Sequence, residues 1–168
     1  MQKYIGTKMI CSTPMTRLEW CRYRGWTLPA DENGADEGYF VEYLDGGAPN
    51  HQDHAGYISW SPKDVHDQAY RPVDGMSFGL AIEALKLGRR VARAGWNGKG
   101  MWIAYTPGSE FAPEFAKAGH AAAHRTAEEP NEPVRLLPHI DMRAADGSMV
   151  IGWLASQTDM LADDWQML

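Results

Sequence analysis

The chain has 168 residues, of which 44% are hydrophobic and 23% are charged, as is usual for a globular protein. Its formal net charge is −6, and an acidic chain is a poor binder of nucleic-acid polymers because phosphate neutralisation needs clustered Lys and Arg. No apolar run approaches the ~18 residues of a membrane span, and the N-terminus has no signal-peptide core. We therefore expect a soluble intracellular protein with neither a membrane nor a nucleic-acid polymer as partner.

The cysteine content argues against a metal-stabilised fold. Cys11 and Cys21 are the only cysteines, lie in separate predicted elements and match no CxxC pattern. We expect both to be reduced thiols, and we expect no structural zinc site and no cofactor.

The N-terminal half predicts a small module over residues 1–72. Aromatic and β-branched runs predict strands at residues 4–12, 38–44 and 56–60. Thr-Pro and Ser-Pro steps predict two helices, over residues 13–23 and 61–70. Residues 71–75 are the expected linker.

The C-terminal half predicts a second module over residues 76–168. Apolar residues recur there at the spacing of one buried helix face, so residues 78–87 are expected to form a helix that Ser77 caps and Gly88 ends. The residues of that face are Phe78, Ala81, Ile82 and Leu85.

Strands are predicted to follow that helix at residues 89–94, 101–106, 136–143 and 148–152. Residues 110–133 are expected to be an irregular excursion with a short helix near residues 113–124. The expected fold class is α+β, with two small modules that each pack one or two helices on an antiparallel sheet.

Two Trp-centred segments are the most informative features of the chain. Residues 93–101 read Arg-Ala-Gly-Trp-Asn-Gly-Lys-Gly-Met, and residues 153–159 read Trp-Leu-Ala-Ser-Gln-Thr-Asp. Each places a flat ring beside small residues and amide or hydroxyl groups, which suits a flat, polar, phosphorylated ligand. Neither contains a nucleophile–base pair, so we expect binding without catalysis. The candidate ligand-binding residues are Arg93, Trp96, Asn97, Lys99, Trp153, Ser156, Gln157 and Asp159.

Each segment also has a purely structural interpretation. Asn97-Gly98 between two strands is typical of a tight turn, although Lys99 and the nearby glycines also suit a phosphate cradle. Ser156 to Asp159 match the S-x-x-D pattern of a helix start, although a helix start can also bind an anion. The Trp rings are either core residues or stacking surfaces, and the sequence leaves both alternatives open.

His139 and Asp141 suggest an acid–base pair or a metal site, because alternate residues share one face of a strand. Two ligands do not make a metal site, and no third stands out. We therefore expect neither a metal nor a catalytic residue here.

Residues 76–168 resemble the Thoeris anti-defence 2 family of small phage proteins. Four segments carry the resemblance, in family order and spacing: residues 78–86, 91–101, 138–142 and 153–159. The N-terminal half resembles a separate small module that recurs in phage proteins and has no established activity. Its matching segments are residues 3–8, 24–26, 37–43 and 56–63.

The resemblance implies a sponge for an immune signal. Members of the family bind the cyclic ADP-ribose isomer made by TIR-domain enzymes of Thoeris defence and hold it intact, and some also hold cyclic dinucleotides. They assemble as homotetramers with pockets at subunit interfaces. This chain is accordingly expected to be a phage anti-defence protein of the host bacterial cytoplasm. By residue type, we expect Trp96 and Trp153 to stack on adenine and Asn97, Ser156, Gln157 and Asp159 to bond its polar edges.

Two rival functions belong to other classes. One is a cyclic nucleotide phosphodiesterase or hydrolase that uses His139 and Asp141. The other is an interaction module whose Trp-rich surfaces bind a protein partner.

Overall fold

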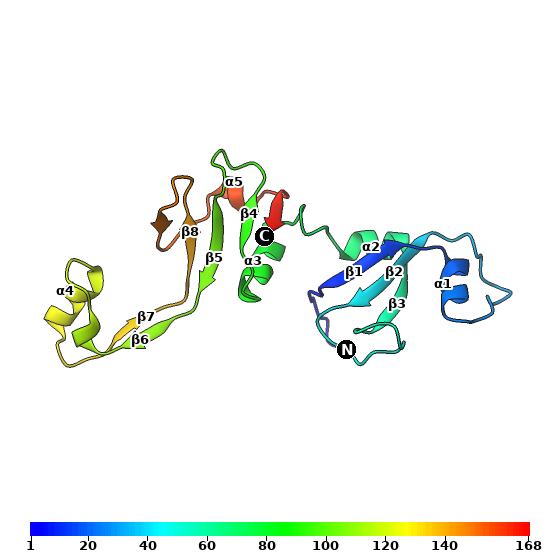
Figure 1. The fold of residues 1–168 in the computed structure, drawn as a ribbon, viewed down its shortest axis with the longest axis horizontal. Helices are drawn as coiled ribbons and strands as arrows, with labels where there is room; N and C mark the ends of the chain where they lie inside the picture. The colour runs from blue at the N-terminus through cyan, green and yellow to red at the C-terminus, as the bar shows by residue number, and fades with distance from the viewer. The chain divides into compact units, whose positions relative to one another are not determined.

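The computed structural model describes residues 1–168, and the chain divides into two compact units, Met1–Arg71 and Pro72–Leu168. Both units combine antiparallel sheets with helices (Figure 1), so the predicted α+β class is confirmed. No helix is both long enough and apolar enough to cross a membrane.

The N-terminal unit is built on a three-stranded antiparallel sheet in the order β1-β2-β3. These strands are Ile10–Pro14, Gly38–Tyr43 and Ile58–Pro62. Helix α1 (Arg17–Tyr23) connects β1 to β2, and α2 (Lys63–Ala69) follows β3. Trp20, Cys21, Val41 and Ile58 are its buried apolar residues.

The first strand and helix of this unit begin later than predicted. Pro14 does not start the helix but ends β1 opposite Tyr39, which is allowed because an edge strand can include a residue without an N–H donor. The helix begins after Thr16, whose hydroxyl accepts a hydrogen bond from the Glu19 N–H while the Glu19 carboxylate accepts one from the Thr16 N–H. This capping box is the stronger start signal.

The C-terminal unit contains a five-stranded antiparallel sheet in the order β10-β4-β5-β8-β9. The strands are β4 (Val91–Arg93), β5 (Trp102–Thr106), β8 (His139–Arg143), β9 (Met149–Val150) and β10 (Trp165–Met167). Strand β10 was not predicted, because a three-residue strand that starts with Trp carries no alternation to recognise.

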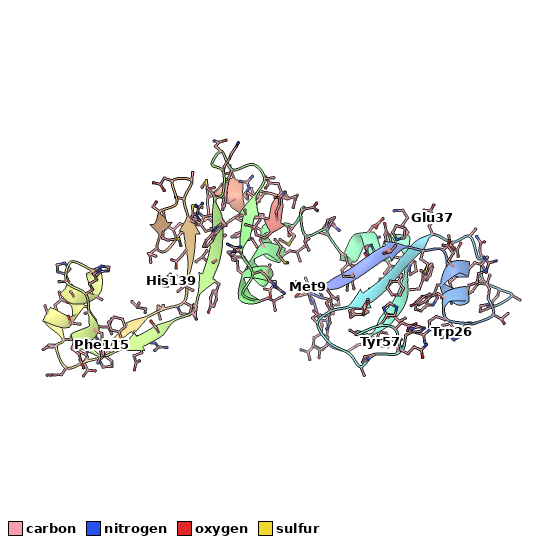
Figure 2. All side chains as sticks on the ribbon, in the orientation of Figure 1. Met9, Trp26, Glu37, Tyr57, Phe115 and His139 are labelled. Atoms are coloured by element: carbon pink, nitrogen blue, oxygen red, sulfur yellow. The ribbon has the colours of Figure 1, made fainter.

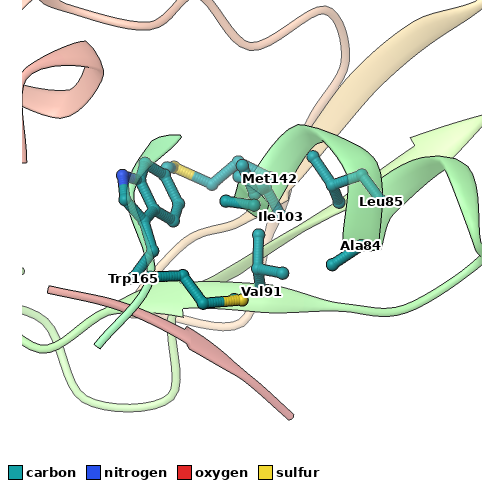
Figure 3. Packing of buried hydrophobic residues seen from close by; sticks show 8 residues of the cluster. Ala84, Leu85, Val91, Ile103, Met142 and Trp165 are labelled. Atoms are coloured by element: carbon teal, nitrogen blue, oxygen red, sulfur yellow. The ribbon is translucent and has the colours of Figure 1, made fainter. Parts of the chain in front are cut away.

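The core of the C-terminal unit lies between this sheet and helix α3 (Phe78–Lys86), as Figure 3 shows. The strand register aligns Met167 with Val91, Val91 with Ile103 and Ile103 with Met142, which forms one apolar row across four strands. Leu85 and Trp165 are buried in the same cluster.

A two-stranded arm interrupts the predicted excursion between β5 and β8. Strands β6 (Ser109–Phe111) and β7 (Val134–Leu136) pair antiparallel and directly follow β5 and precede β8. Between them lie a 3₁₀ turn, Pro113–Phe115, and helix α4 (Ala121–Glu128), so the predicted helix over residues 113–124 was placed too early. Gly119 has a positive φ and separates the two. His139 lies where the arm joins the sheet (Figure 2).

Substitutions of two neighbouring leucines are expected to have very different effects on the free energy of unfolding. Leu85 is 1% exposed and Leu87 is 63% exposed. Leu85→Ala is expected to lower the free energy of unfolding by about 2–5 kcal/mol, because it leaves a cavity under the sheet. Leu87→Ala is expected to change it by no more than about 0.5 kcal/mol. Urea unfolding of both variants measures the difference, and equal effects would contradict this description of the core.

Candidate functional site

Three tryptophans pack against one another at the end of the sheet in the C-terminal unit. The ring centroids of Trp96 and Trp153 are 6.2 Å apart, those of Trp96 and Trp165 are 5.4 Å apart, and those of Trp153 and Trp165 are 6.3 Å apart. All three pairs are edge-to-face, the favoured geometry for aromatic pairs. Trp165 is fully buried, whereas Trp96 and Trp153 are partly exposed. The two candidate stacking residues are therefore held on a buried third ring.

The carboxylate of Asp159 connects this Trp cluster to its surroundings. Its Oδ1 accepts from Arg93 Nη1 at 2.9 Å and from Trp96 Nε1 at 3.1 Å. Its Oδ2 accepts from the backbone N–H of Ser156 at 3.1 Å and from Ser156 Oγ at 2.6 Å. The backbone carbonyl of Asp159 also accepts from Trp165 Nε1 at 3.0 Å. One residue thereby orients two of the three indoles.

Burial and hydrogen bonding shift the pKa of the Asp159 carboxyl in opposite directions. Burial by itself would raise the pKa of the Asp159 carboxyl, but hydrogen bonds from Ser156, Arg93 and Trp96 stabilise the charged form and lower the pKa to about 2. Arg93 is shared, since its Nε also donates to Asp164 Oδ1 at 2.8 Å. The Arg93 hydrogen bond is the main cause that lowers the pKa of Asp164. The network is thus ionised at neutral pH.

The segment that joins β4 to β5 is a loop of eight residues, 94–101, and the predicted tight turn at Asn97-Gly98 is wrong. Such a turn needs positive φ angles, yet the residue with a positive φ is Gly100. Gly98 is required for a different reason: a Cβ there would lie 2.5 Å from Met101 Sδ and 2.6 Å from Ala145 Cβ. The loop is a packed structure rather than a minimal connection.

Three hydrogen bonds that involve side chains fix this loop to the rest of the unit. The Gly95 N–H donates to Asp164 Oδ2 at 2.7 Å, the Trp96 indole donates to Asp159, and Arg143 Nη1 donates to the Gly100 carbonyl at 2.7 Å. The three partners, Asp164, Asp159 and Arg143, lie in three different segments of the chain, so the loop and the Trp96 ring have one defined position.

The S-x-x-D pattern does start a helix, as predicted. Helix α5 (Gln157–Met160) has Ser156 as its N-cap and a complete capping box with Asp159. The Ser156 hydroxyl is therefore occupied by Asp159, and it also lies 2.8 Å from Thr158 Oγ1. The carboxylate of Asp159 therefore already occupies the start of α5 as a hydrogen-bond acceptor.

The predicted ligand-binding residues consequently fall into two groups. Arg93, Trp96 and Asp159 form one hydrogen-bonded network, with Trp153 packed against Trp96. The other group consists of exposed residues that flank the Trp cluster: Asn97, Lys99, Ser156 and Gln157. Of these, Ser156 also belongs to the network, because its hydroxyl donates to Asp159.

His139 and Asp141 do lie together on β8, with His139 Nε2 3.4 Å from Asp141 Oδ1. The buried Asp141 carboxylate also accepts from Thr106 Oγ1 at 2.5 Å and from the Gly152 N–H at 3.0 Å. These contacts fit a residue that fixes the segment after β9 to the sheet. No three His, Cys, Asp or Glu side chains lie close enough together to hold a metal ion.

Sequence reasoning missed three residues of the site: Asp164, Arg143 and Trp165. Asp164 and Trp165 lie in a short terminal segment that has no recognisable pattern, and Arg143 was assigned only to a strand. The pairing of β10 with β4 brings Asp164 beside Arg93, 71 residues away in the chain, and no local signal could predict that contact.

The ion network predicts a pH-dependent contribution to stability. The pKa of Asp159 is lowered from 3.8 to about 2 in the folded chain, so its contribution is present above pH 4 and is lost as pH falls toward 2. Asp159→Asn is expected to lower the free energy of unfolding by about 2 kcal/mol at pH 7 and by much less near pH 2.

Urea unfolding at both pH values measures this difference. Asp163→Asn is the matched control, because Asp163 is an exposed neighbour in the same segment. An Asp159→Asn effect that is equal at pH 7 and pH 2 would show that the charge of Asp159 does not stabilise the fold.

Comparison with known proteins identifies the C-terminal unit. The family model described as the Thoeris anti-defense 2-like domain matches residues 76–168. The protein named Thoeris anti-defense 2 of Bacillus phage SP01 is 39% identical over 93 residues, which is 55% of this chain and 94% of that relative. The match includes the loop at residues 94–101, α5 and the three tryptophans. The chain therefore belongs to the Thoeris anti-defense 2-like family.

Proposed function

We propose that this protein is a phage anti-defence protein that binds and sequesters a cyclic nucleotide immune signal without cleaving it. The proposed ligand is the TIR-derived cyclic ADP-ribose isomer, with cyclic dinucleotides as a second ligand class. Membership of a family named for Thoeris anti-defence supports the role. The observation that carries the ligand class is the pair of partly exposed indoles, Trp96 and Trp153, beside exposed amide and amino groups.

The two groups of site residues suggest separate roles. Trp96 and Trp153 offer ring surfaces to a purine, and such stacking contributes roughly 1–3 kcal/mol per base. Asn97, Lys99 and Gln157 offer polar groups, and Lys99 supplies a positive charge for a phosphate. Ser156 is exposed, but its hydroxyl bonds Asp159, so its role is to cap α5 beside the ligand. Arg93 and Asp159 already bond each other, so we assign them to positioning Trp96 and the α5 start. A site held in place before the ligand arrives loses less entropy on binding.

Sequestration without cleavage is favoured over hydrolysis by the contacts of the one histidine–carboxylate pair in this unit. His139 Nδ1 lies 2.8 Å from the Leu137 carbonyl and its Nε2 faces Asp141 Oδ1 at 3.4 Å, so both ring nitrogens point at oxygens of the chain. Both oxygens of Asp141 also accept hydrogen bonds, from Thr106 and the Gly152 N–H. A general base needs a free lone pair directed at the substrate. These contacts leave the pair a structural role.

We propose that the protein acts as a homotetramer with its ligand sites at subunit interfaces. The segments on either side of the site residues expose large apolar side chains, and Leu154 is 89% and Leu161 is 82% exposed. Ile151, Met149 and Met160 are exposed in the same stretch. Apolar residues that gather beside a binding site commonly mark an association surface.

Calorimetric titration with the TIR-derived cyclic ADP-ribose isomer tests the ligand site. Trp96→Ala and Trp153→Ala are each expected to weaken binding roughly 5- to 150-fold, the equivalent of 1–3 kcal/mol. Asn97→Ala and Lys99→Ala change exposed side chains, so they test the same site without disturbing the Trp cluster. Trp26→Ala removes an exposed Trp of the N-terminal unit and is expected to leave binding unchanged. Normal binding by all four site variants would exclude this site.

Sedimentation velocity tests the association surface. The double variant Leu154→Glu/Leu161→Glu is expected to sediment as monomers or dimers where the unmodified chain sediments as a tetramer, because buried unpaired carboxylates are costly. Leu87→Glu is the control at another exposed leucine. A monomeric unmodified chain, or a double variant that remains tetrameric, would contradict the proposed assembly.

A further inference from the structure

The N-terminal unit contains a hydrogen-bonded relay of a carboxylate, an imidazole and a phenol. Glu42 on β2 lies with its Oε2 2.9 Å from His54 Nδ1, and His54 Nε2 lies 2.5 Å from Tyr23 Oη at the end of α1. The three residues come from three different segments of the chain. This order of groups, an oriented base beside an O–H, is the arrangement that activates a nucleophile.

The direction of each proton in the relay follows from its carboxylate end. The Glu42 side chain accepts from His54 and, through Oε1, from the Gly56 N–H at 3.0 Å, and these hydrogen bonds lower the pKa of Glu42. A carboxylate can only accept, so His54 Nδ1 carries the ring proton and a neutral His54 has its lone pair on Nε2. Tyr23 Oη then donates to that lone pair. The tautomer assigned from this network makes His54 the base for the Tyr23 phenol.

The surrounding contacts hold the relay in place. The ring of Tyr23 stacks on His51, with the ring centroids 5.2 Å apart, and meets Phe40 edge-on, with the centroids 5.9 Å apart. The Phe40 ring also packs on His54 at a centroid distance of 5.1 Å. The loop that includes His54 is closed by Asn50, whose side chain both accepts from the Ile58 N–H and donates to its carbonyl, each at 2.8 Å. His54 is thus fixed by the loop as well as by its two partners.

The guanidinium of Arg24, the residue that follows Tyr23 in the chain, packs in the aromatic cluster that includes Trp20 and Trp26. The guanidinium carbon of Arg24 lies 5.4 Å from the ring centroid of Trp20 and 4.8 Å from that of Trp26. The Trp20 ring also stacks on Tyr23, with the ring centroids 6.4 Å apart. Figure 2 labels Trp26 in this part of the unit. Arg24 Nη1 is buried and has no hydrogen-bond partner in the chain, which is rare for a buried donor. Phosphate oxygens are the acceptors that a guanidinium binds best. Because Nη1 is covered in the free chain, Arg24 meets a phosphoryl donor only after its side chain turns out of this stack.

We propose that Tyr23 is an activated oxygen nucleophile, and that the N-terminal unit accepts a phosphoryl group on it from a phosphorus(V) donor. The Tyr23 Oη–P bond forms as the bond from phosphorus to its leaving group breaks. The leaving group departs with the electron pair, and the phenolic proton passes to His54 Nε2. Glu42 stabilises the resulting imidazolium.

A second histidine contact in this unit is a weaker candidate. His66 Nε2 lies 3.0 Å from Ser12 Oγ, and its Nδ1 lies 3.3 Å from Asp67 Oδ1. Asp67 is exposed and its other oxygen binds Lys63 Nζ at 2.6 Å. The negative charge of Asp67 is therefore already paired with Lys63, whereas the carboxylate of Glu42 has no lysine or arginine partner and bonds His54.

Reaction of the full chain with diisopropyl fluorophosphate tests the proposal, with adducts mapped by mass spectrometry after digestion. The reagent is a phosphorus(V) electrophile that releases fluoride. Tyr105 is the internal control, because Tyr23 and Tyr105 are both 40% exposed. General-base assistance predicts that Tyr23 is labelled on the order of 100-fold faster than Tyr105.

Three variants separate activation from simple exposure. His54→Gln retains a polar side chain but not a base, so Tyr23 labelling is expected to fall to the rate of Tyr105. Glu42→Gln is expected to slow it partly. His51→Gln removes ring contacts with Tyr23 and His54 and a 3.3 Å hydrogen bond from the Asp53 N–H but neither bond of the relay, so it is expected to leave the labelling high. Circular dichroism confirms that each variant is folded. Equal labelling of Tyr23 and Tyr105, preferential labelling of Ser12, or full Tyr23 labelling in folded His54→Gln would overturn the proposal.

Discussion

The carboxylate of Asp159 is the group on which the arrangement of the C-terminal unit depends most. It accepts hydrogen bonds from Arg93, Trp96 and Ser156, and the carbonyl of the same residue accepts one from Trp165. Strand β4, the loop after it, helix α5 and strand β10 therefore meet at one ionised residue. Since a buried carboxylate is stable only when its lone pairs are filled, the four elements are positioned together. The partly exposed faces of Trp96 and Trp153 are a consequence of that arrangement.

The same network explains which parts of the site could be predicted from sequence. The capping box at Ser156 and Asp159 and the apolar face of α3 are local patterns, and both are present in the structure. The loop at residues 94–101 could not be predicted, because its shape is set by Asp164 and Arg143, which are distant in sequence. Strand β1 was placed too early for a similar reason. Its register is set by pairing with β2 and not by its own residues.

The N-terminal unit differs from the C-terminal unit in the kind of chemistry that its polar groups allow. In the C-terminal unit, Asp159 and Arg93 neutralise each other and support aromatic surfaces. In the N-terminal unit, Glu42 orients an imidazole toward a phenol at the surface. Both units use a carboxylate to fix a partner on another element, but the relay of Glu42, His54 and Tyr23 also places a phenolic proton beside an imidazole nitrogen. The family assignment covers residues 76–168 and does not extend to the N-terminal unit.

We propose that the C-terminal unit holds a cyclic nucleotide and returns it unchanged. The most direct measurement is to saturate the protein with the TIR-derived cyclic ADP-ribose isomer, remove free ligand, denature the complex by heat and analyse the released molecule by chromatography and mass spectrometry. If the ligand is held intact, a molecule with the mass and retention time of the starting ligand is released in stoichiometric amount. Release of a linear or otherwise hydrolysed product would contradict it and would make the protein an enzyme.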